Sequence, residues 1–154
     1  MAEKRVKIDP EKIHLLGVKI IKGNIDVDDE FDESELSSFS VDFDTKEGFI
    51  IGEKIVRLMF SASIVGVDKE NKKLPLSADF TFEFIFRVDN LDDYIEALDG
   101  EKKSVSVHSI LGHNLIAIVY STARGIILTR TQGTVVKDGI LLPVIDTSTL
   151  LKRT

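Results

Sequence analysis

The sequence predicts an α+β domain. The expected order is a four-stranded antiparallel sheet, arranged as a meander, followed by a long helix, an apolar crossover and a short C-terminal helix. In the first half of the chain, apolar and polar residues alternate over several runs, as in half-buried strands. Residues 105–131 instead place apolar residues at helical spacing and contain neither an acidic residue nor a proline. Strands followed by a helix are typical of α+β proteins.

The composition fits a single globular domain. A chain of 154 residues with 43% hydrophobic residues can bury a sizeable core. The net charge of -6 argues against nucleic acid as a partner, because phosphate binding requires clustered Lys and Arg. No cysteine is present, which excludes disulfides and thiolate metal ligands. The polar N-terminus lacks the apolar core of a secretory signal, so we expect a cytoplasmic protein.

The first two strands are expected near the N-terminus. We expect residues 1–12, which are charged and contain Pro10, to be a flexible lead, and residues 13–151 to form the domain. Residues 13–27 are rich in β-branched residues, and the shift of the apolar phase at Ile20 and Ile21 predicts a bulge. After an acidic loop at 28–35, residues 38–45 alternate cleanly. This alternation places Asp42 and Asp44 on the solvent face, before a turn at 46–48.

The third and fourth strands are expected at 53–67 and 74–88, joined by a hairpin loop at 68–73. The fourth carries phenylalanine at every second position, Phe80, Phe82, Phe84 and Phe86, which predicts an aromatic ridge packed against the long helix. Residues 88–103 read as a polar linker with a short helix that ends at Gly100.

The helix at 105–131 has two sets of apolar positions on different faces. One set is Leu111, Leu115, Ile118 and Thr122; the other is Ile116, Val119, Tyr120, Ala123 and Ile127. A helix with two apolar faces needs two covers, so we assign the sheet to one and a second copy of the chain to the other. The first set is taken as the oligomer interface, although spacing alone does not decide which set meets the sheet. Polar residues interrupt the apolar run too early for a membrane span, so we expect no membrane insertion.

The C-terminal part begins after Gly133, a usual end of a helix. Pro143 favours an extended conformation for the apolar residues 140–145. Asp146 or Thr147 can then cap a final short helix through Leu150 and Leu151.

Few residues point to chemistry. No phosphate loop, dinucleotide fingerprint or nucleophile elbow is present. His108 and His113 are five residues apart and do not share a helix face, so we expect neither a metal nor a cofactor. Asp42 and Asp44 offer an acid–base pair for an enzyme, but their strand face favours a role in solubility. Arg124, on a mostly apolar helix, is expected to form a salt bridge.

Several segments together resemble the SecB family of protein-export chaperones. The strand from Phe39 to Asp44 stands where that family has alternating apolar residues and aspartates. Leu111-Gly112 followed by Tyr120-Ser-Thr-Ala123-Arg124 is similar to the elements of its long helix. Gly133-Thr134 and the run from Ile140 to Asp146 resemble the segment after that helix.

The resemblance implies an ATP-independent chaperone (a holdase) that binds unfolded or precursor polypeptides in an apolar groove and forms a homotetramer, a dimer of dimers. The residues that it assigns to the peptide-binding groove are Phe49, Phe84, Ile140, Leu141, Leu142, Val144, Leu150 and Leu151. It also implies an acidic face that docks the Sec translocation motor, matched here by Asp26, Asp42 and Asp44.

Three alternatives stay open beside protein export. Lys19 and Lys22 stand in the first strand where motor docking would need acidic residues, so the chain equally fits a SecB-like chaperone dedicated to one partner, such as an antitoxin. A non-chaperone interaction module would have residues 140–145 packed shut. An enzyme would need a pocket around carboxylates such as Asp42 and Asp44.

Overall fold

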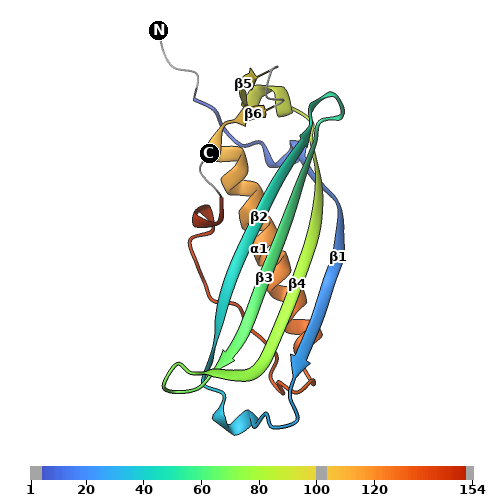
Figure 1. Cartoon of the computed structure of the whole chain (residues 1–154). Coiled ribbons are helices and arrows are strands. Elements are labelled where there is room, and N and C mark those ends of the chain that lie inside the picture. Colours follow the sequence, from blue (N-terminus) through green and yellow to red (C-terminus); the bar gives the residue numbers. More distant parts are fainter. Residues whose placement is uncertain (1–4, 100–103, 152–154) are drawn as a thin grey trace.

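The computed structural model describes residues 5–99 and 104–151. Four long strands form an antiparallel sheet: β1 (Ile13–Val27), β2 (Ser38–Ile50), β3 (Ile55–Val67) and β4 (Lys73–Val88). One long helix, α1 (Ser109–Thr131), crosses one face of this sheet diagonally, as Figure 1 shows. The predicted α+β architecture, with its antiparallel sheet and long helix, is confirmed.

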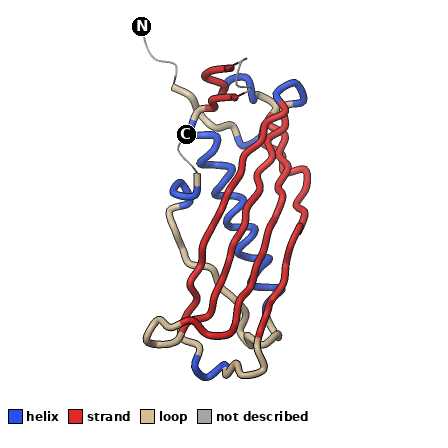
Figure 2. The backbone as a smooth tube through the Cα atoms, viewed as in Figure 1, coloured by secondary structure: helices blue, strands red, loops and turns tan. Residues whose placement is uncertain are grey.

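The order of the strands in the sheet is β1-β4-β3-β2. Strands β2, β3 and β4 form the predicted meander, whereas β1 pairs with β4 and not with its neighbour in sequence. The acidic connection between β1 and β2 explains this difference. It contains a 3-10 helix at Glu33–Glu35 and passes below the ends of β3 and β4 (Figure 2), a distance of about three strand spacings, roughly 15 Å.

Strand β1 is an edge strand with two irregularities. The predicted bulge at Ile20 and Ile21 is confirmed by a shift in pairing between Ile20 and Lys22, and a second shift occurs between Leu15 and Gly17. The strand keeps several large apolar side chains at the surface: Leu15, Leu16, Ile20, Ile21 and Val27. Within the described part of the chain, β4 is its only partner strand.

The predicted turn at 46–48 is wrong, because β2 continues to Ile50 in register with β3. The chain reverses instead through a 3-10 helix at Ile51–Glu53, and Lys54 takes the left-handed conformation that closes the turn, with φ 60°. Asp42 and Asp44 pair with Ser63 and Ser61 on the sheet face opposite α1.

The core lies between α1 and the aromatic ridge. Phe80, Phe82, Phe84 and Phe86 are all buried, as are the residues of β3 that point the same way. Stacked and edge-on contacts join the rings of Phe60, Phe43 and Tyr120, so the aromatic cluster extends from the sheet to the helix.

The helix begins later than predicted. Residues Ser104–Val107 form strand β6, which pairs with β5 (Ile95–Asp99) in a small second sheet, and Leu91–Tyr94 form a 3-10 helix. The predicted short helix in the linker 88–103 is confirmed by the 3-10 helix at Leu91–Tyr94, whereas strand β5 was not predicted. The predicted helix stop at Gly100 lies outside the described residues. His108 ends the hairpin and caps α1, because its Nδ1 accepts the Ile110 N–H at 3.1 Å.

By length and composition alone, α1 could cross a membrane. In this structure the same residues cover the aromatic ridge, and their removal would expose those rings to water.

The N-terminal segment packs on the domain. Val6 and Ile8 lie against the core, and the Tyr94 hydroxyl donates a hydrogen bond to the Lys7 carbonyl at 3.0 Å. The segment 6–8 thus contacts the domain, while the flexibility expected for residues 1–12 stays a prediction. Pro10–Lys12 form a 3-10 helix that Asp9 caps.

Phe82→Ala tests the central role of the aromatic ridge. Because Phe82 is fully buried, we expect this change to lower the free energy of unfolding by about 3–5 kcal/mol, measured by urea denaturation. Val135→Ala, at an exposed apolar residue, is the control and should change it by less than about 0.5 kcal/mol. Equal effects of the two changes would contradict this description of the core.

Candidate functional site

The crossover, residues 138–146, follows α1 and runs back along the side of the molecule where β2 lies (Figure 1). Its side chains alternate in orientation, as in a strand. Ile140 and Leu142 are buried in the core, whereas 55% of Leu141 and 85% of Val144 are exposed. The crossover therefore presents an apolar outer edge while its inner side chains anchor it.

Three side chains of α1 bind the crossover backbone. The Thr131 hydroxyl accepts the Ile140 N–H at 2.7 Å and donates to the Ile127 carbonyl at 2.7 Å. Arg124 Nε donates to the Leu142 carbonyl at 2.7 Å. The Tyr120 hydroxyl donates to the Pro143 carbonyl, and burial raises the pKa of this hydroxyl, which keeps it protonated. Residues 140–143 are thereby fixed on the helix.

A glycine turn makes this return possible. Gly139 has a φ of +79°, and a Cβ there would lie 2.9 Å from the Leu128 carbonyl oxygen. Any other residue would be strained and would collide with the helix backbone.

The last described segment, residues 144–151, lies between α1 and β2. It contains a 3-10 helix at Thr147–Leu150, which the Asp146 side chain caps, as predicted, by accepting the Ser148 N–H at 3.1 Å. The buried Thr45 hydroxyl of β2 donates to the Leu150 carbonyl at 2.6 Å. Leu151 fills the space above Gly112, where an added Cβ would lie 3.1 Å from Leu151 Cδ1.

Glu47 of β2 lies near Gly112 and Leu151. Its Oε1 would be 3.9 Å from a Cβ at Gly112, so the carboxyl group sits beside Leu151 on the helix side of β2. Partial removal from water raises the pKa of this carboxyl group. The described residues show no ion pair for it.

The residues predicted to line a groove are thus divided between surface and core. Leu141 and Val144 are exposed, and Phe49, Leu150 and Leu151 are partly buried. Phe84, Ile140 and Leu142 are buried with at most 1% exposure, so these three cannot form part of the surface that this chain presents. Phe84 lies in the aromatic ridge, and the other two point inward because the crossover alternates.

The predicted oligomer face of α1 needs a similar correction. Leu111 and Leu115 are buried with 1% exposure, together with every member of the second apolar set. The helix therefore buries one broad side that includes residues of both sets. Ile118, 39% exposed, and the partly exposed Thr122 border the outward side. The other exposed positions on that side are Asn114, Ala117, Ser121, Gly125 and Thr129.

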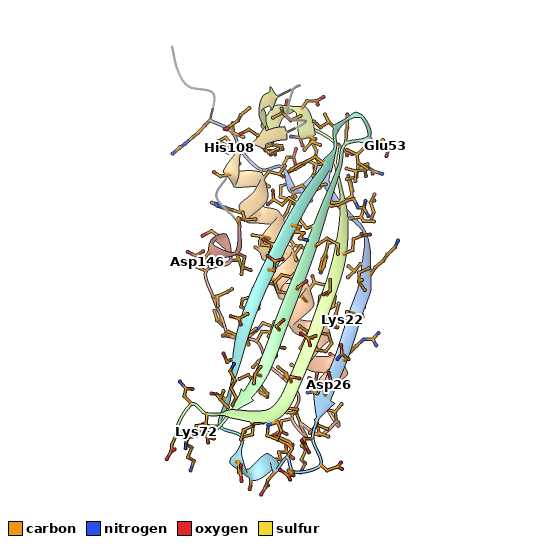
Figure 3. All side chains as sticks on the ribbon, viewed as in Figure 1. Lys22, Asp26, Glu53, Lys72, His108 and Asp146 are labelled. Atoms are coloured by element: carbon orange, nitrogen blue, oxygen red, sulfur yellow. The ribbon has the colours of Figure 1, made fainter. Side chains whose placement is uncertain are left out.

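The three predicted docking carboxylates share the outer sheet face but lie on opposite edges. Asp26 is on β1, near Lys22 in Figure 3, and accepts a hydrogen bond from Asn24. Asp42 and Asp44 are on β2, beyond β4 and β3. Lys22, on the same strand as Asp26, has its Nζ 4.0 Å from Asp79 of β4, the strand next to β1. The three aspartates thus form no single patch.

The salt bridge predicted for Arg124 is not found among the described residues, because its partner is the Leu142 backbone carbonyl and not a carboxylate.

His14 Nε2 lies 2.9 Å from Asp89 Oδ2, and this hydrogen bond lowers the pKa of Asp89. Among the described residues, no group of three His, Asp or Glu side chains could hold a metal ion.

Sequence reasoning missed the roles of four residues around the C-terminal part: Thr45, Glu47, Gly112 and Thr131. Thr45 and Glu47 carried a detectable signal, because the alternation of β2 continues through them if the turn at 46–48 is not assumed. Thr131 carried no such signal in the sequence, because its hydrogen bond with the Ile140 N–H depends on the turn at Gly139.

Comparison with known proteins relates the fold to a class of chaperones. No protein-family model and no curated sequence matches the chain. A solved structure of the Mycobacterium tuberculosis Rv1957 SecB-like chaperone, in complex with a ChAD peptide from the Rv1956 HigA1 antitoxin, is similar, with a TM-score of 0.60. The two share 11% identity over 88% of this chain and 91% of that one. A Streptococcus agalactiae protein of unknown function matches with a TM-score of 0.45 and 12% identity, over 86% and 97% of the two chains.

The similarity to the Mycobacterium tuberculosis protein shows that this chain has a SecB-like fold, as the sequence resemblance predicted.

Glu47→Gln tests the electrostatics beside Leu151. Because the folded pKa lies above the ordinary value of 4.5, the ionised carboxylate destabilises the folded chain above the folded pKa. We expect the substitution to raise the melting temperature at pH 7, and the gain to disappear as the pH falls below 4.5.

The control is Glu53→Gln, which removes the same charge from an exposed position in the 3-10 helix at Ile51–Glu53. Glu53→Gln should not raise the melting temperature at pH 7. A gain for Glu47→Gln that persists at low pH would contradict burial as its cause.

Proposed function

We propose that this protein is an ATP-independent chaperone that holds unfolded polypeptides on the apolar edge of its crossover. The observation that supports this most is the pair of exposed side chains, Leu141 and Val144, on a backbone fixed to α1 at Ile140, Leu142 and Pro143. Large apolar side chains that are exposed close together on a fixed extended segment favour an interaction surface.

Such a surface suits unfolded clients. Apolar contact depends on area and shape and makes little demand on the identity of each side chain, so one surface can hold many sequences. Release then requires only competition for the client and not nucleotide hydrolysis.

Two classes of client fit this surface. One is secretory precursors delivered to the Sec motor; the other is a single dedicated partner, such as an antitoxin. The similar Mycobacterium tuberculosis chaperone was solved with an antitoxin peptide, which supports the second class. The split of Asp26 from Asp42 and Asp44 weakens the case for motor docking. Both classes place the chain in the cytosol.

We further propose that the working form is a homotetramer. The edge strand β1 keeps apolar side chains and one row of backbone groups without a partner in the described chain, which suits pairing with a second β1. The outward side of α1, with Ile118 beside Ala117 and Ser121, then offers a close contact between two dimers.

Leu141→Asp should weaken the hold on unfolded chains. The charge would have to be removed from water when a client covers the crossover, so we expect about a tenfold loss in suppression of aggregation of a refolding test protein, without nucleotide. The control is Asp138→Asn, a charge change on the same loop. Unchanged suppression by Leu141→Asp would overturn the assignment, and no suppression by the native chain would favour a plain interaction module.

Ile118→Lys should break the contact between dimers. We expect light scattering to give four times 17.2 kDa for the native chain and half that mass for the variant, with an unchanged circular dichroism spectrum. Leu115→Lys should instead unfold the chain, because Leu115 faces the aromatic ridge. A native monomer, or a variant of unchanged mass, would contradict the proposed interface.

A further inference from the structure

The outer face of the sheet, opposite α1, carries opposite charges at its two ends. Its side chains lie in rows that cross the sheet, with one residue from each strand. The three rows nearest Ile51–Glu53 form a basic half, whose Lys, Arg and carboxylate side chains are Lys19, Lys46, Arg57, Arg87 and Glu83. The next three rows form an acidic half, with Asp26, Asp42, Asp44, Asp79 and Lys22. Figure 3 labels Glu53 at the basic end and Asp26 at the acidic end.

One row of the basic half has glycine at both ends. This glycine row consists of Gly48, Arg57, Ile85 and Gly17, in order from β2 to β1. A Cβ at Gly17 would meet no other atom within 4 Å, and a Cβ at Gly48 would meet only the Arg57 Cβ, at 4.0 Å. The row is therefore open at both edges of the sheet, where an extended chain can lie across it.

Two unpaired lysines border the glycine row. Lys46 and Lys19 occupy the ends of the neighbouring row, with Met59 and Glu83 between them. Both lysines are exposed, and among the described residues neither forms an ion pair. Glu83 is only 8% exposed and accepts a hydrogen bond from Arg57 at 2.7 Å, so its charge already has a partner. The row thus offers one free ammonium group at each edge of the sheet.

The separation of these two lysines matches the repeat of an extended chain. Three strand spacings separate β2 from β1, which amounts to roughly 14 Å. In an extended chain, side chains four residues apart point the same way and lie roughly 13 Å apart. Two carboxylates at that spacing can meet Lys19 and Lys46 together. The residue midway between them would lie near Met59 and Glu83, where an apolar side chain is favoured because a carboxylate would be repelled.

The charge pattern also limits the length of the bound anion. The basic half spans three rows, roughly 14 Å along the strands. Beyond it, Asp42 and Asp79 would repel a longer anion. Nucleic acid and an anionic membrane surface both extend past this limit, whereas a short acidic segment of a protein ends before it.

We propose that the glycine row is a docking site for a short, extended acidic segment of a partner protein, with two carboxylates four residues apart and an apolar residue midway between them. Lys19 and Lys46 bind the carboxylates, and Met59 and Ile85 contact the apolar residue. This site goes beyond the proposed function, because it lies on the sheet face opposite α1 and the crossover.

Peptide binding tests the spacing. The probe is a fluorescently labelled peptide with blocked ends and the sequence Glu-Ser-Leu-Ser-Glu, titrated with the whole protein at low salt and followed by anisotropy. The control peptide, Ser-Glu-Leu-Glu-Ser, has the same composition with its carboxylates two residues apart. We expect the probe to bind about threefold or more tightly than the control, and its affinity to fall as salt is added. Equal affinity of the two peptides would overturn the proposal.

Lys19→Gln with Lys46→Gln tests the residues. This variant should bind the probe about fivefold or more weakly than the native chain, because both ion pairs are lost. The matched control is Lys69→Gln with Lys73→Gln, which removes two exposed lysines at the acidic end of the sheet and should leave the affinity unchanged. An equal loss in both variants would show attraction to net charge alone and overturn the site.

Two further measurements separate the site from other functions. Vesicles that contain phosphatidylserine should not bind; if they bind through Lys19 and Lys46 and the peptide does not, the partner is a membrane and the proposal is wrong. Suppression of aggregation should be the same for the native chain and for Lys19→Gln with Lys46→Gln. Failure of the docking site and failure of the chaperone function are therefore distinguishable.

Discussion

The contact between α1 and the aromatic ridge of β4 is the constraint on which the rest of this structure depends. The ridge requires an apolar cover, and α1 supplies it with one broad side that includes Leu111, Leu115 and Ile116. The diagonal course of the helix then decides what else is covered. The C-terminal end of α1 lies away from β2 (Figure 1). The crossover runs from that end back to the side where β2 lies, and Thr131 and Arg124 hold it on the helix.

In this arrangement, one set of side chains anchors the crossover and another set forms its exposed edge. Inward side chains and backbone hydrogen bonds hold residues 140–143, which leaves Leu141 and Val144 at the surface without loss of order. The following residues are held by the Thr45 hydroxyl, and Leu151 is seated above Gly112.

Much of the fold followed from local patterns in the sequence. The period-two phenylalanines of β4 and the apolar phase shift at Ile20 are each visible within the sequence of a single strand, and both were predicted correctly. Features set by distant contacts were not. The place of β1 beside β4 depends on how the acidic connection crosses the sheet end. The burial of Leu111 and Leu115 depends on how widely the helix is covered, and the partner of Arg124 depends on the glycine turn at 139.

The central claim is that unfolded polypeptides bind along the crossover and the adjoining face of α1 and β2. Photo-cross-linking locates such binding most directly, with a photoreactive residue placed at Val144 in one variant and at Ser63, on the outer sheet face, in another. With an unfolded test protein, this account predicts cross-links from position 144 and none from position 63. Cross-links from the outer sheet face alone would contradict it.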